Sequence, residues 1–326
     1  MERHGYNMIK ITDNARKELC EKLSIDEANL TFLGGGREDS DGTVFTFKDD
    51  SKKKVLKILA FPEAEKDKLQ YLIIRIKYAN FLGENGIQIA YPLRNTNGTL
   101  FETSLDDNHY YAAYVMDYCD GKNPESSELT NELVYQWGKL TGKSHLITKL
   151  FGEKIEESKL GHEEELDFFT NWCKDTEIKA AWSQMNHILK GFHRCEDDYG
   201  FIHNDNHQRN ILVSGHDITL IDFDCSCRQF FVQDIITPAQ GIMFDITGGM
   251  ISPIKEEDHL KKFFDSFING YETEHHLSDF WYQQIPLFLN YRRMLLFTCM
   301  QDWLNTEPEL KKNFKENILN PPKFHL

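Results

Sequence analysis

Two short stretches hold the polar residues that decide the fold: GFIHNDNHQRNIL at residues 200–212 and IDFD at residues 221–224. Between them, Ser-Gly-His-Asp (214–217) is typical of a turn, and the apolar residues on both sides predict the two strands of a β-hairpin. Asn210 opens the first strand and Asp222 closes the second. Because a hairpin brings its open ends together, we expect the side chains of Asn210 and Asp222 to face one cation.

The residue types at these positions suit phosphoryl transfer. An amide oxygen from Asn210 and a carboxylate from Asp222 are the oxygen ligands that Mg²⁺ prefers, together with water and phosphate. Asp205, which precedes Asn210 in the loop, is expected to meet an acceptor hydroxyl in front of the metal. A base for the nucleophile and a metal for the phosphates are the parts that phosphoryl transfer needs. The alternative interpretation is a structural loop with capping carboxylates.

The spacing His203-x-Asp205-x4-Asn210, followed by Asp222-x-Asp224, resembles the aminoglycoside phosphotransferase family. That family belongs to the kinase-like superfamily and includes choline and homoserine kinases. Its version of the protein-kinase Asp-Phe-Gly element resembles the second motif. The resemblance covers most of the chain and implies an α+β, bilobal protein-kinase-like fold. Such a fold has a small N-terminal lobe with an antiparallel sheet and a larger, mainly helical C-terminal lobe.

The pattern along the chain also indicates two lobes. Val44–Phe47 and Val55–Ala60 predict a strand hairpin, and Lys66–Glu84 predicts a long helix. Beyond the first third of the chain the patterns become mainly helical. We therefore expect an N-terminal nucleotide-binding lobe at residues 1–116 and a helical C-terminal lobe, with the catalytic loop and the acceptor site, at residues 117–326.

A nucleotide site is expected in the first lobe. Three glycines before the hairpin resemble a divergent glycine-rich loop, whose backbone N–H groups approach phosphate oxygens. Lys57 is the charge inside the apolar segment VLKILA, and the resemblance implies that it bridges the α- and β-phosphates; the alternative is an edge-strand lysine that reaches water. The implied hinge holds the adenine edge through backbone groups. The residues assigned to the nucleotide are Gly34, Gly35, Gly36, Lys57, Met116, Asp117 and Tyr118.

The resemblance implies an ATP-dependent phosphotransferase that moves the γ-phosphate to a hydroxyl of a small molecule, with ATP or GTP and Mg²⁺ as cofactors. Asp205 would be the catalytic residue, while Asn210 and Asp222 would hold the metal, with Asp224 as a further ligand. One alternative is a nucleotide-binding pseudokinase or scaffold. Another is a bacterial protein Ser/Thr kinase, which is disfavoured because no activation loop ending in Ala-Pro-Glu follows Asp222.

The sequence departs from the family pattern in two places. Asn204 stands where the family usually has glycine, and asparagine tolerates the unusual backbone angles of such a loop. The glutamate that pairs with the strand lysine is not found where it is expected, since the helix offers Arg75 and Lys77 there; Glu63 and Glu65 lie earlier and are the alternatives. The partner of Lys57 therefore stays open, and its absence favours the scaffold alternative.

Other residues are expected to shape the loop. Asp234 resembles the aspartate that holds the catalytic loop by hydrogen bonds, and His145 and His203 are expected to be structural. His207, inside the loop, is expected to be exposed to solvent, with a substrate contact as the alternative.

The acceptor is expected to carry a positive charge. Most of the negative charge falls in residues 117–326, and a cleft of one sign concentrates ligands of the other. Trp281, Tyr282 and Tyr291 could stack on a sugar or an ammonium group. Arg292-Arg293 could instead clamp a carboxylate or a phosphate, or pair with nearby acids.

Composition narrows the class of protein. A net charge of −15 argues against a general nucleic-acid binder and against docking on anionic lipid. No apolar run reaches the roughly 20 residues of a membrane span. The acidic stretch Glu153–Asp167 is more typical of a solvated helix face than of a binding tail. Seven scattered cysteines without a CxxC pair suit a reducing cytoplasm. The expected partner is the small-molecule hydroxyl acceptor, without nucleic acid or membrane.

Overall fold

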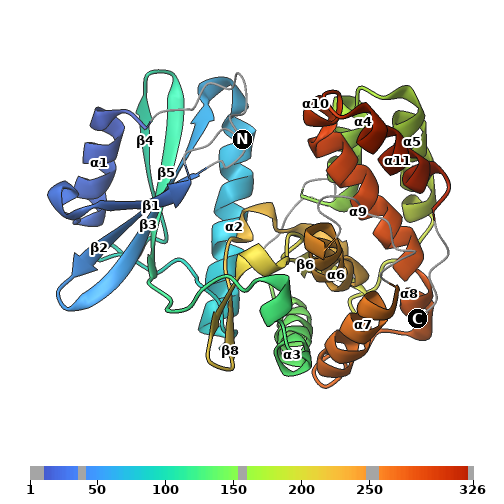
Figure 1. Ribbon diagram of the computed structural model, residues 1–326. Helices are drawn as coiled ribbons and strands as arrows, with labels where there is room; N and C mark the ends of the chain where they lie inside the picture. The colour runs from blue at the N-terminus through green and yellow to red at the C-terminus, as the bar shows by residue number, and fades with distance from the viewer. Residues whose placement is uncertain (1–10, 36–41, 153–159, 247–256, 322–326) are drawn as a thin grey trace. The chain divides into compact units, whose positions relative to one another are not determined.

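The computed structural model describes residues 11–35, 42–152, 160–246 and 257–321 (Figure 1). The chain divides into two compact units, residues 1–120 with 221–224, and residues 121–220 with 225–326. The lobe boundary expected from the sequence lies between residues 116 and 117. The structure continues the last strand of the first unit to Asp117 and the unit itself to Asp120. The sequence also did not indicate that the segment carrying Asp222 and Asp224 belongs to the first unit.

The first unit is built on an antiparallel five-stranded sheet with the order β1-β2-β3-β5-β4. Its strands are β1 (Thr31–Gly35), β2 (Gly42–Asp49), β3 (Lys52–Pro62), β4 (Glu102–Asp106) and β5 (His109–Asp117). Its helices are α1 (Asp13–Leu23) and α2 (Lys66–Glu84). The predicted hairpin is β2–β3, in which Val44 pairs with Lys57, and the predicted long helix is α2.

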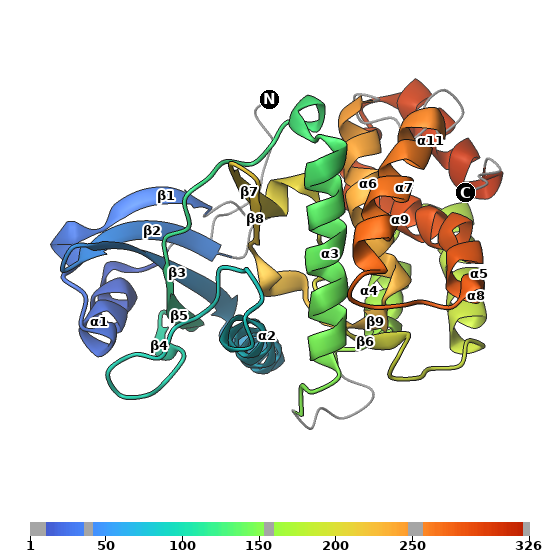
Figure 2. The same ribbon diagram turned by 90° about the horizontal axis from the view of Figure 1, so that it is seen from below.

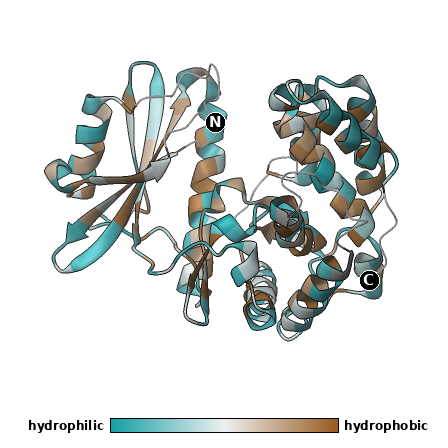
Figure 3. Cartoon of the chain, viewed as in Figure 1, coloured by the Kyte–Doolittle hydropathy of each residue, from teal (hydrophilic) through white to brown (hydrophobic). Residues whose placement is uncertain are grey.

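The two helices cover opposite faces of this sheet. Successive side chains of a strand point to opposite faces. Leu56 and Ile58 of β3 accordingly pack in one core with α1, while Leu59 and Phe61 pack in another with α2. Lys57 has the same parity as Leu59, so its side chain lies on the α2 face. Figure 3 shows hydrophobic colour in the middle of the strands and hydrophilic colour towards the free end of the β2–β3 hairpin.

The second unit is mainly helical (Figure 2). Its helices are α3 (Asn131–Thr148), α4 (His162–Trp172), α5 (Thr176–Lys190), α6 (Val232–Ile246), α7 (Glu257–Tyr271), α8 (Asp279–Gln283), α9 (Ile285–Cys299), α10 (Gln301–Leu304) and α11 (Pro308–Leu319). Two short antiparallel pairs accompany them: β6 (Tyr199–Ile202) with β9 (Cys227–Phe230), and β7 (Ile211–Ser214) with β8 (Asp217–Leu220). The β7–β8 pair is the hairpin predicted from the sequence.

Helices α3 and α7 approach each other closely because α3 has two glycines at the contact. A Cβ atom on Gly138 would lie 1.9 Å from the carbonyl oxygen of Phe267, and one on Gly142 would lie 2.5 Å from that of Tyr271. At both positions a side chain would meet backbone, which cannot move aside cheaply. Thr130 caps the start of α3, where its hydroxyl accepts the N–H of Leu133 at 3.2 Å. Helix α3 is thereby fixed as the support for the loop described below.

The aromatic residues expected to stack on a ligand are part of the core of this unit or are bonded within it. Trp281 is 3% exposed and Tyr291 is 0% exposed. The Trp281 ring packs beside Phe230, with centroids 4.8 Å apart. Tyr282 is half-buried and donates a hydrogen bond to Glu272. Burial removes the ring faces of Trp281 and Tyr291 from any ligand, so the stacking expectation is wrong for these two residues.

Candidate active site

Asp205 lies in the loop between β6 and β7, and each of its carboxylate oxygens has polar partners. Oδ1 accepts from the guanidinium of Arg292 at 3.4 Å. Oδ2 accepts from Asn210 Nδ2 at 3.1 Å and lies 3.4 Å from His207 Nε2. His207 Nδ1 accepts the N–H of Arg209 at 3.1 Å, so the ring proton is on Nε2 and is directed at Asp205. His207 is thus a partner of Asp205 rather than a solvated side chain.

These contacts decide the charge of Asp205. Burial alone would raise the pKa of its carboxyl, but the hydrogen bond and charge of His207, and the charges of Arg292 and His203, hold the pKa far below its usual range. The side chain is therefore a carboxylate at neutral pH. An ionised, partly exposed carboxylate can accept a hydrogen bond from a hydroxyl and orient it.

Asp234, in the first turn of α6, holds the loop on its buried side. Its two carboxylate oxygens accept the backbone N–H groups of His203 at 2.8 Å and Asn204 at 2.7 Å. His145 Nε2 lies 3.3 Å from the same carboxylate, and its ring stacks on Phe231. The geometry agrees with the expected roles of Asp234 and His145. Asn204 takes φ 65°, the left-handed conformation that asparagine adopts more readily than most residues.

Helix α3 holds the next residue of the loop. Trp137 Nε1 donates to Asn206 Oδ1 at 2.7 Å, and Asn206 Nδ2 donates to Thr141 Oγ1 at 3.0 Å. Asn206 is 0% exposed, and both ends of its amide are bonded. The chain around Asp205 is therefore fixed from α3 and α6 together, which gives the carboxylate a defined position.

Asn210 is oriented by Asp205. Its Nδ2 donates to the Asp205 backbone oxygen at 2.8 Å as well as to the carboxylate, so the amide oxygen Oδ1 turns the other way. Ile211 pairs with Leu220 at the open end of the hairpin. The structure therefore brings Asp205 and Asn210 together within the second unit. An amide oxygen turned away from its neighbours is a hard donor of the kind that Mg²⁺ takes.

The first unit brings together Lys57, Asp222 and Asp224. Lys57 Nζ lies 3.0 Å from Asp222 Oδ1 and 2.6 Å from Asp224 Oδ2, and Tyr114 OH lies 3.3 Å from Asp224 Oδ1. Burial opposes the charge of Lys57, but Asp224, Tyr114 and Asp222 keep its pKa well above the usual value. The open question of the partner of Lys57 thus has an answer: two carboxylates on the 222–224 segment take the place of a helix glutamate.

The remaining nucleotide residues fall at strand ends. Gly34 and Gly35 end β1, whereas Gly36 lies outside the described residues. Gly35 has φ +79°, and a Cβ there would lie 2.1 Å from the Gly42 carbonyl oxygen, so this position requires glycine. Met116 and Asp117 end β5, and Asp117 pairs with Lys54 at 2.8 Å.

Tyr118 follows β5 and is fixed by the neighbouring strand. Its N–H donates to Lys53 O at 3.2 Å, and Lys53 Nζ lies 3.6 Å from the centre of its ring. This backbone N–H is one of the groups that were expected to hold the adenine edge. It is therefore already paired with β3 in this structure.

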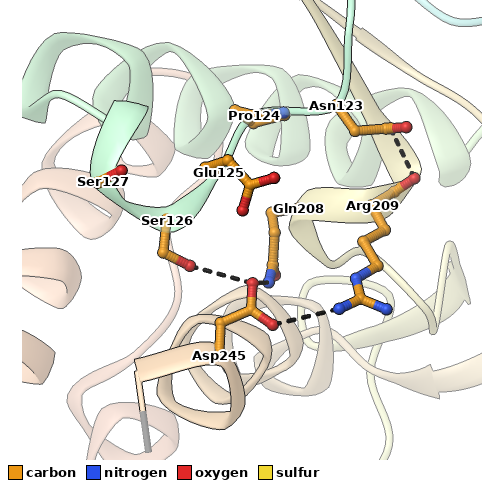
Figure 4. A pocket seen from close by; sticks show the side chains of 8 residues that line it. All are labelled: Asn123, Pro124, Glu125, Ser126, Ser127, Gln208, Arg209 and Asp245. Atoms are coloured by element: carbon orange, nitrogen blue, oxygen red, sulfur yellow. Dashed lines mark hydrogen bonds and ion pairs between the residues drawn. The ribbon is translucent and has the colours of Figure 1, made fainter. Parts of the chain in front are cut away.

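A pocket of about 670 Å³ adjoins the loop (Figure 4). Seven of the eight residues that line it are polar: Asn123, Pro124, Glu125, Ser126, Ser127, Gln208, Arg209 and Asp245. Asp245, near the end of α6, accepts from Gln208 Nε2 at 2.6 Å, from Ser126 Oγ at 3.2 Å and from Arg209 at 3.4 Å. Two carboxylates, two hydroxyls and one guanidinium suit a hydrophilic ligand.

Sequence reasoning missed three residues: Tyr114, Asp245 and Glu165, the last of which accepts a hydrogen bond from Asn204 Nδ2 of the loop at 2.6 Å. Tyr114 is paired across the sheet with Lys57, which the strand pattern could have indicated. Glu165 and Asp245 lie in helices whose sequences contain no functional motif. Their contacts with the loop become apparent only from the packing of these helices. Among the residues that the structure describes, no cluster of three metal-ligating side chains forms, and no helix is long and apolar enough to cross a membrane.

The second unit holds an ionised carboxylate beside an oriented asparagine, and the first holds a buried lysine beside two aspartates; these are residue types that phosphoryl transfer needs. The model of the phosphotransferase enzyme family matches residues 31–259, and the chain belongs to this family. It is therefore an ATP-dependent phosphotransferase that acts on a hydroxyl group of a small molecule.

Individual relatives agree with this assignment. The chain is 27% identical over 317 residues to the amicoumacin kinase of Bacillus subtilis (strain 168), which covers 93% of this chain and 90% of that protein. An amicoumacin kinase in complex with AMP-PNP, Ca²⁺ and Ami has a similar structure, with a TM-score of 0.79, 20% identity and 95% of each chain covered. A choline kinase from Streptococcus pneumoniae gives a TM-score of 0.54 at 13% identity, over 93% of this chain and 98% of that one. The fold is the protein-kinase-like fold expected from the sequence.

Proposed function

We propose that this chain phosphorylates a hydroxyl of amicoumacin or of a related hydrophilic compound, with Asp205 as the catalytic residue. The observation that carries the proposal is the Asp205 carboxylate itself, which is held ionised by Arg292 and His207 on an anchored loop. The named acceptor rests on likeness to amicoumacin kinases across more than nine-tenths of the chain. The Asp205 carboxylate would orient the acceptor hydroxyl and receive its proton, a contribution of roughly 10²–10⁴-fold in rate.

Asn210 and Asp222 are the proposed ligands of Mg²⁺, with Asp224 as a further ligand. The donor set fits this ion, because it consists of an amide oxygen and carboxylates, of which that of Asp222 is half-exposed. When bound, Mg²⁺ would neutralise charge on the transferring phosphate. Lys57 Nζ would then contact the phosphates and keep only part of its contact with the carboxylates of Asp222 and Asp224, because the phosphates carry more negative charge.

The nucleotide is proposed to lie against Gly34–Gly36, Lys57 and Met116–Tyr118. Support comes from the burial of Lys57, which is 7% exposed yet charged. The pocket beside Gln208 and Arg209 is the proposed place for the part of the acceptor that is remote from the reacting hydroxyl. A cytoplasmic location belongs to the same proposal, and all seven cysteines are free thiols.

The alternative function is a nucleotide-binding scaffold that does not turn over its substrate. It was favoured because the sequence did not show which acid pairs with Lys57. The two aspartates that hold Lys57 remove that argument, because the lysine is oriented without a helix glutamate. The two functions are separated by measuring ATP consumption with Mg²⁺ in the presence and absence of acceptor. Nucleotide binding without any turnover would support the scaffold.

The test of the acceptor is a comparison of amicoumacin, spectinomycin, choline and aminopropanol at equal concentration. With amicoumacin we expect ATP consumption above the level in water and a mass increase of one phosphate. We expect Asp205→Asn to slow both about 10²–10⁴-fold. Phosphorylation of choline or aminopropanol instead would refute the named acceptor while leaving the phosphotransferase assignment intact.

A further inference from the structure

One carboxylate connects helix α4, the catalytic loop and helix α9. Glu165, in the first turn of α4, accepts from Asn204 Nδ2 through Oε2 at 2.6 Å. It accepts from Tyr291 OH through Oε1 at 2.5 Å. Both donors are buried, Asn204 at 6% and Tyr291 at 0% exposed. Glu165 therefore holds one residue of the loop and one residue of α9 at the same time, and it is not the solvated acid that its acidic stretch suggested.

Each residue that Glu165 holds is the chain neighbour of an active-site residue. Asn204 precedes Asp205, and Tyr291 precedes Arg292. The Arg292 guanidinium returns to the loop, where it donates to Asn204 O and to Asp205 Oδ1, each at 3.4 Å. The contacts form a closed ring that runs from Glu165 through the loop to Arg292 and back through Tyr291.

We propose that Glu165 is a positioning residue, which fixes the Asp205 carboxylate against Arg292 by holding the chain beside each member of that pair. This role rests on the proposed function, in which Asp205 receives the proton of the acceptor. Glu165 does not touch the reacting atoms; it acts through Asn204 and Tyr291.

The chemistry of the three side chains explains why a carboxylate is required. Hydrogen bonds to an ionised acceptor are about twice as strong as neutral ones. Burial and the neighbouring Glu165 raise the pKa of the Tyr291 hydroxyl well above its usual value, so it stays a donor. Asn204 is a donor through Nδ2. A glutamine at position 165 could accept from Asn204 with its oxygen and donate to the Tyr291 hydroxyl with its nitrogen, but neither bond would be strengthened by a charge, and the hydroxyl proton of Tyr291 would lose its acceptor.

The ring also explains how a residue other than glycine is kept in the loop. Asn204 adopts φ 65°, a conformation that costs a residue with a side chain roughly 1–2 kcal/mol. Its side chain repays part of that cost by bonding Glu165 and, at 3.3 Å, the carbonyl oxygen of Cys225. The Asn204 side chain, which makes this backbone conformation unfavourable, thus also forms the hydrogen bonds that hold the backbone in it.

The experiment compares Glu165→Gln and Tyr291→Phe with a matched control, Glu163→Gln. Glu163 lies in the same helical turn but pairs with Arg194, away from the loop. Hydrogen exchange of peptides covering residues 203–207 is measured first, since it needs no substrate. We expect exchange about tenfold faster in Glu165→Gln and Tyr291→Phe, which matches the loss of one charged hydrogen bond, and no change in the control.

Turnover is measured in the same variants as Mg²⁺-dependent ATP hydrolysis in water and as phosphorylation of amicoumacin. We expect kcat to fall about 10- to 100-fold while KM for ATP stays within about twofold, because displacing a catalytic group by an ångström has effects of this size. The double variant Glu165→Gln/Tyr291→Phe is expected to be no slower than Glu165→Gln, because both changes break the same ring.

Three results would overturn the proposal. Loop exchange equal to that of the control means that Glu165 does not hold the loop, whatever the activity. Faster exchange with control-level kcat means a structural role only, and additive losses in the double variant mean separate pathways. If Glu165→Gln does not fold, Tyr291→Phe carries the comparison. If the wild-type enzyme leaves amicoumacin unphosphorylated, the named acceptor fails, while hydrogen exchange and ATP hydrolysis still decide the role of Glu165.

Discussion

The Arg292 guanidinium lies 3.4 Å from the Asp205 carboxylate, and the residue Arg292 is 5% exposed. Arg292 thus pairs with an acid of its own chain, which is one of the two roles that the sequence left open for it. A buried cation beside the base keeps the base ionised and in place. It also leaves the negative charge of Asp205 largely balanced within the protein.

Arg292→Ala is expected to lower kcat about 100-fold and leave KM for ATP nearly unchanged. The change removes a charged hydrogen-bond donor from Asp205 and from the backbone of Asn204, and misplacement of a base has effects of that order. Arg292→Lys restores the charge without the planar fork and should recover only part of the rate. Steady-state ATP consumption with varied nucleotide measures both constants. A rise in KM for ATP at constant kcat would contradict this role.

Base and metal roles are expected to separate by mutation. Asp222→Ala should weaken binding of Mg-nucleotide and abolish turnover, because it removes a proposed metal ligand. Asp205→Asn should bind Mg-nucleotide normally and lose about 10²–10⁴-fold in turnover. Calorimetric titration with Mg²⁺ and a non-hydrolysable ATP analogue distinguishes the two variants. Normal turnover in Asp205→Asn would refute the assignment of the base.

Lys57→Met is expected to destabilise the protein by about 2 kcal/mol, because it leaves Asp222 and Asp224 beside each other without their cation. The matched control on the same strand is Lys54→Met, whose partner Asp117 is exposed; that pair should contribute less than about 1 kcal/mol. Urea unfolding of both variants gives the comparison. The double variant Lys57→Met/Asp224→Asn should regain part of the loss, and equal losses in the two single variants would contradict the prediction.

The sequence predicted the elements that local pattern controls. The β2–β3 hairpin, helix α2 and the β7–β8 hairpin follow from alternation, helical spacing and a turn sequence, and the structure has all three. Asn204 in a left-handed conformation also follows from its residue type.

What the sequence did not show depends on contacts between distant segments. The partners of Lys57 are more than 160 positions away in the chain, and Glu165 is chosen from several adjacent acids only by where α4 packs. Trp281 and Tyr291 were expected to stack on a ligand because they are aromatic. The residue type alone does not show whether an aromatic ring contacts a ligand or is buried in the hydrophobic core, as these two are. Each of these choices is made by tertiary packing, on which a single sequence is silent.

Stability is expected to fall as pH is lowered from about 6.5 towards 4, through two buried histidines. Burial lowers the pKa of His162 to about 3 and that of His275 to about 4. Between the folded and unfolded pKa values, these histidines are protonated in the unfolded chain but neutral in the folded protein. Their contribution to the free energy of unfolding is therefore fully present above about pH 6.5. Below that pH it decreases by up to about 1.4 kcal/mol per pH unit for each histidine. Urea unfolding at pH 7, 6, 5 and 4.5 measures the slope. His162→Phe should reduce the slope by up to one proton. A wild-type slope that persists fully in both His162→Phe and His275→Phe would assign the acid sensitivity to other groups.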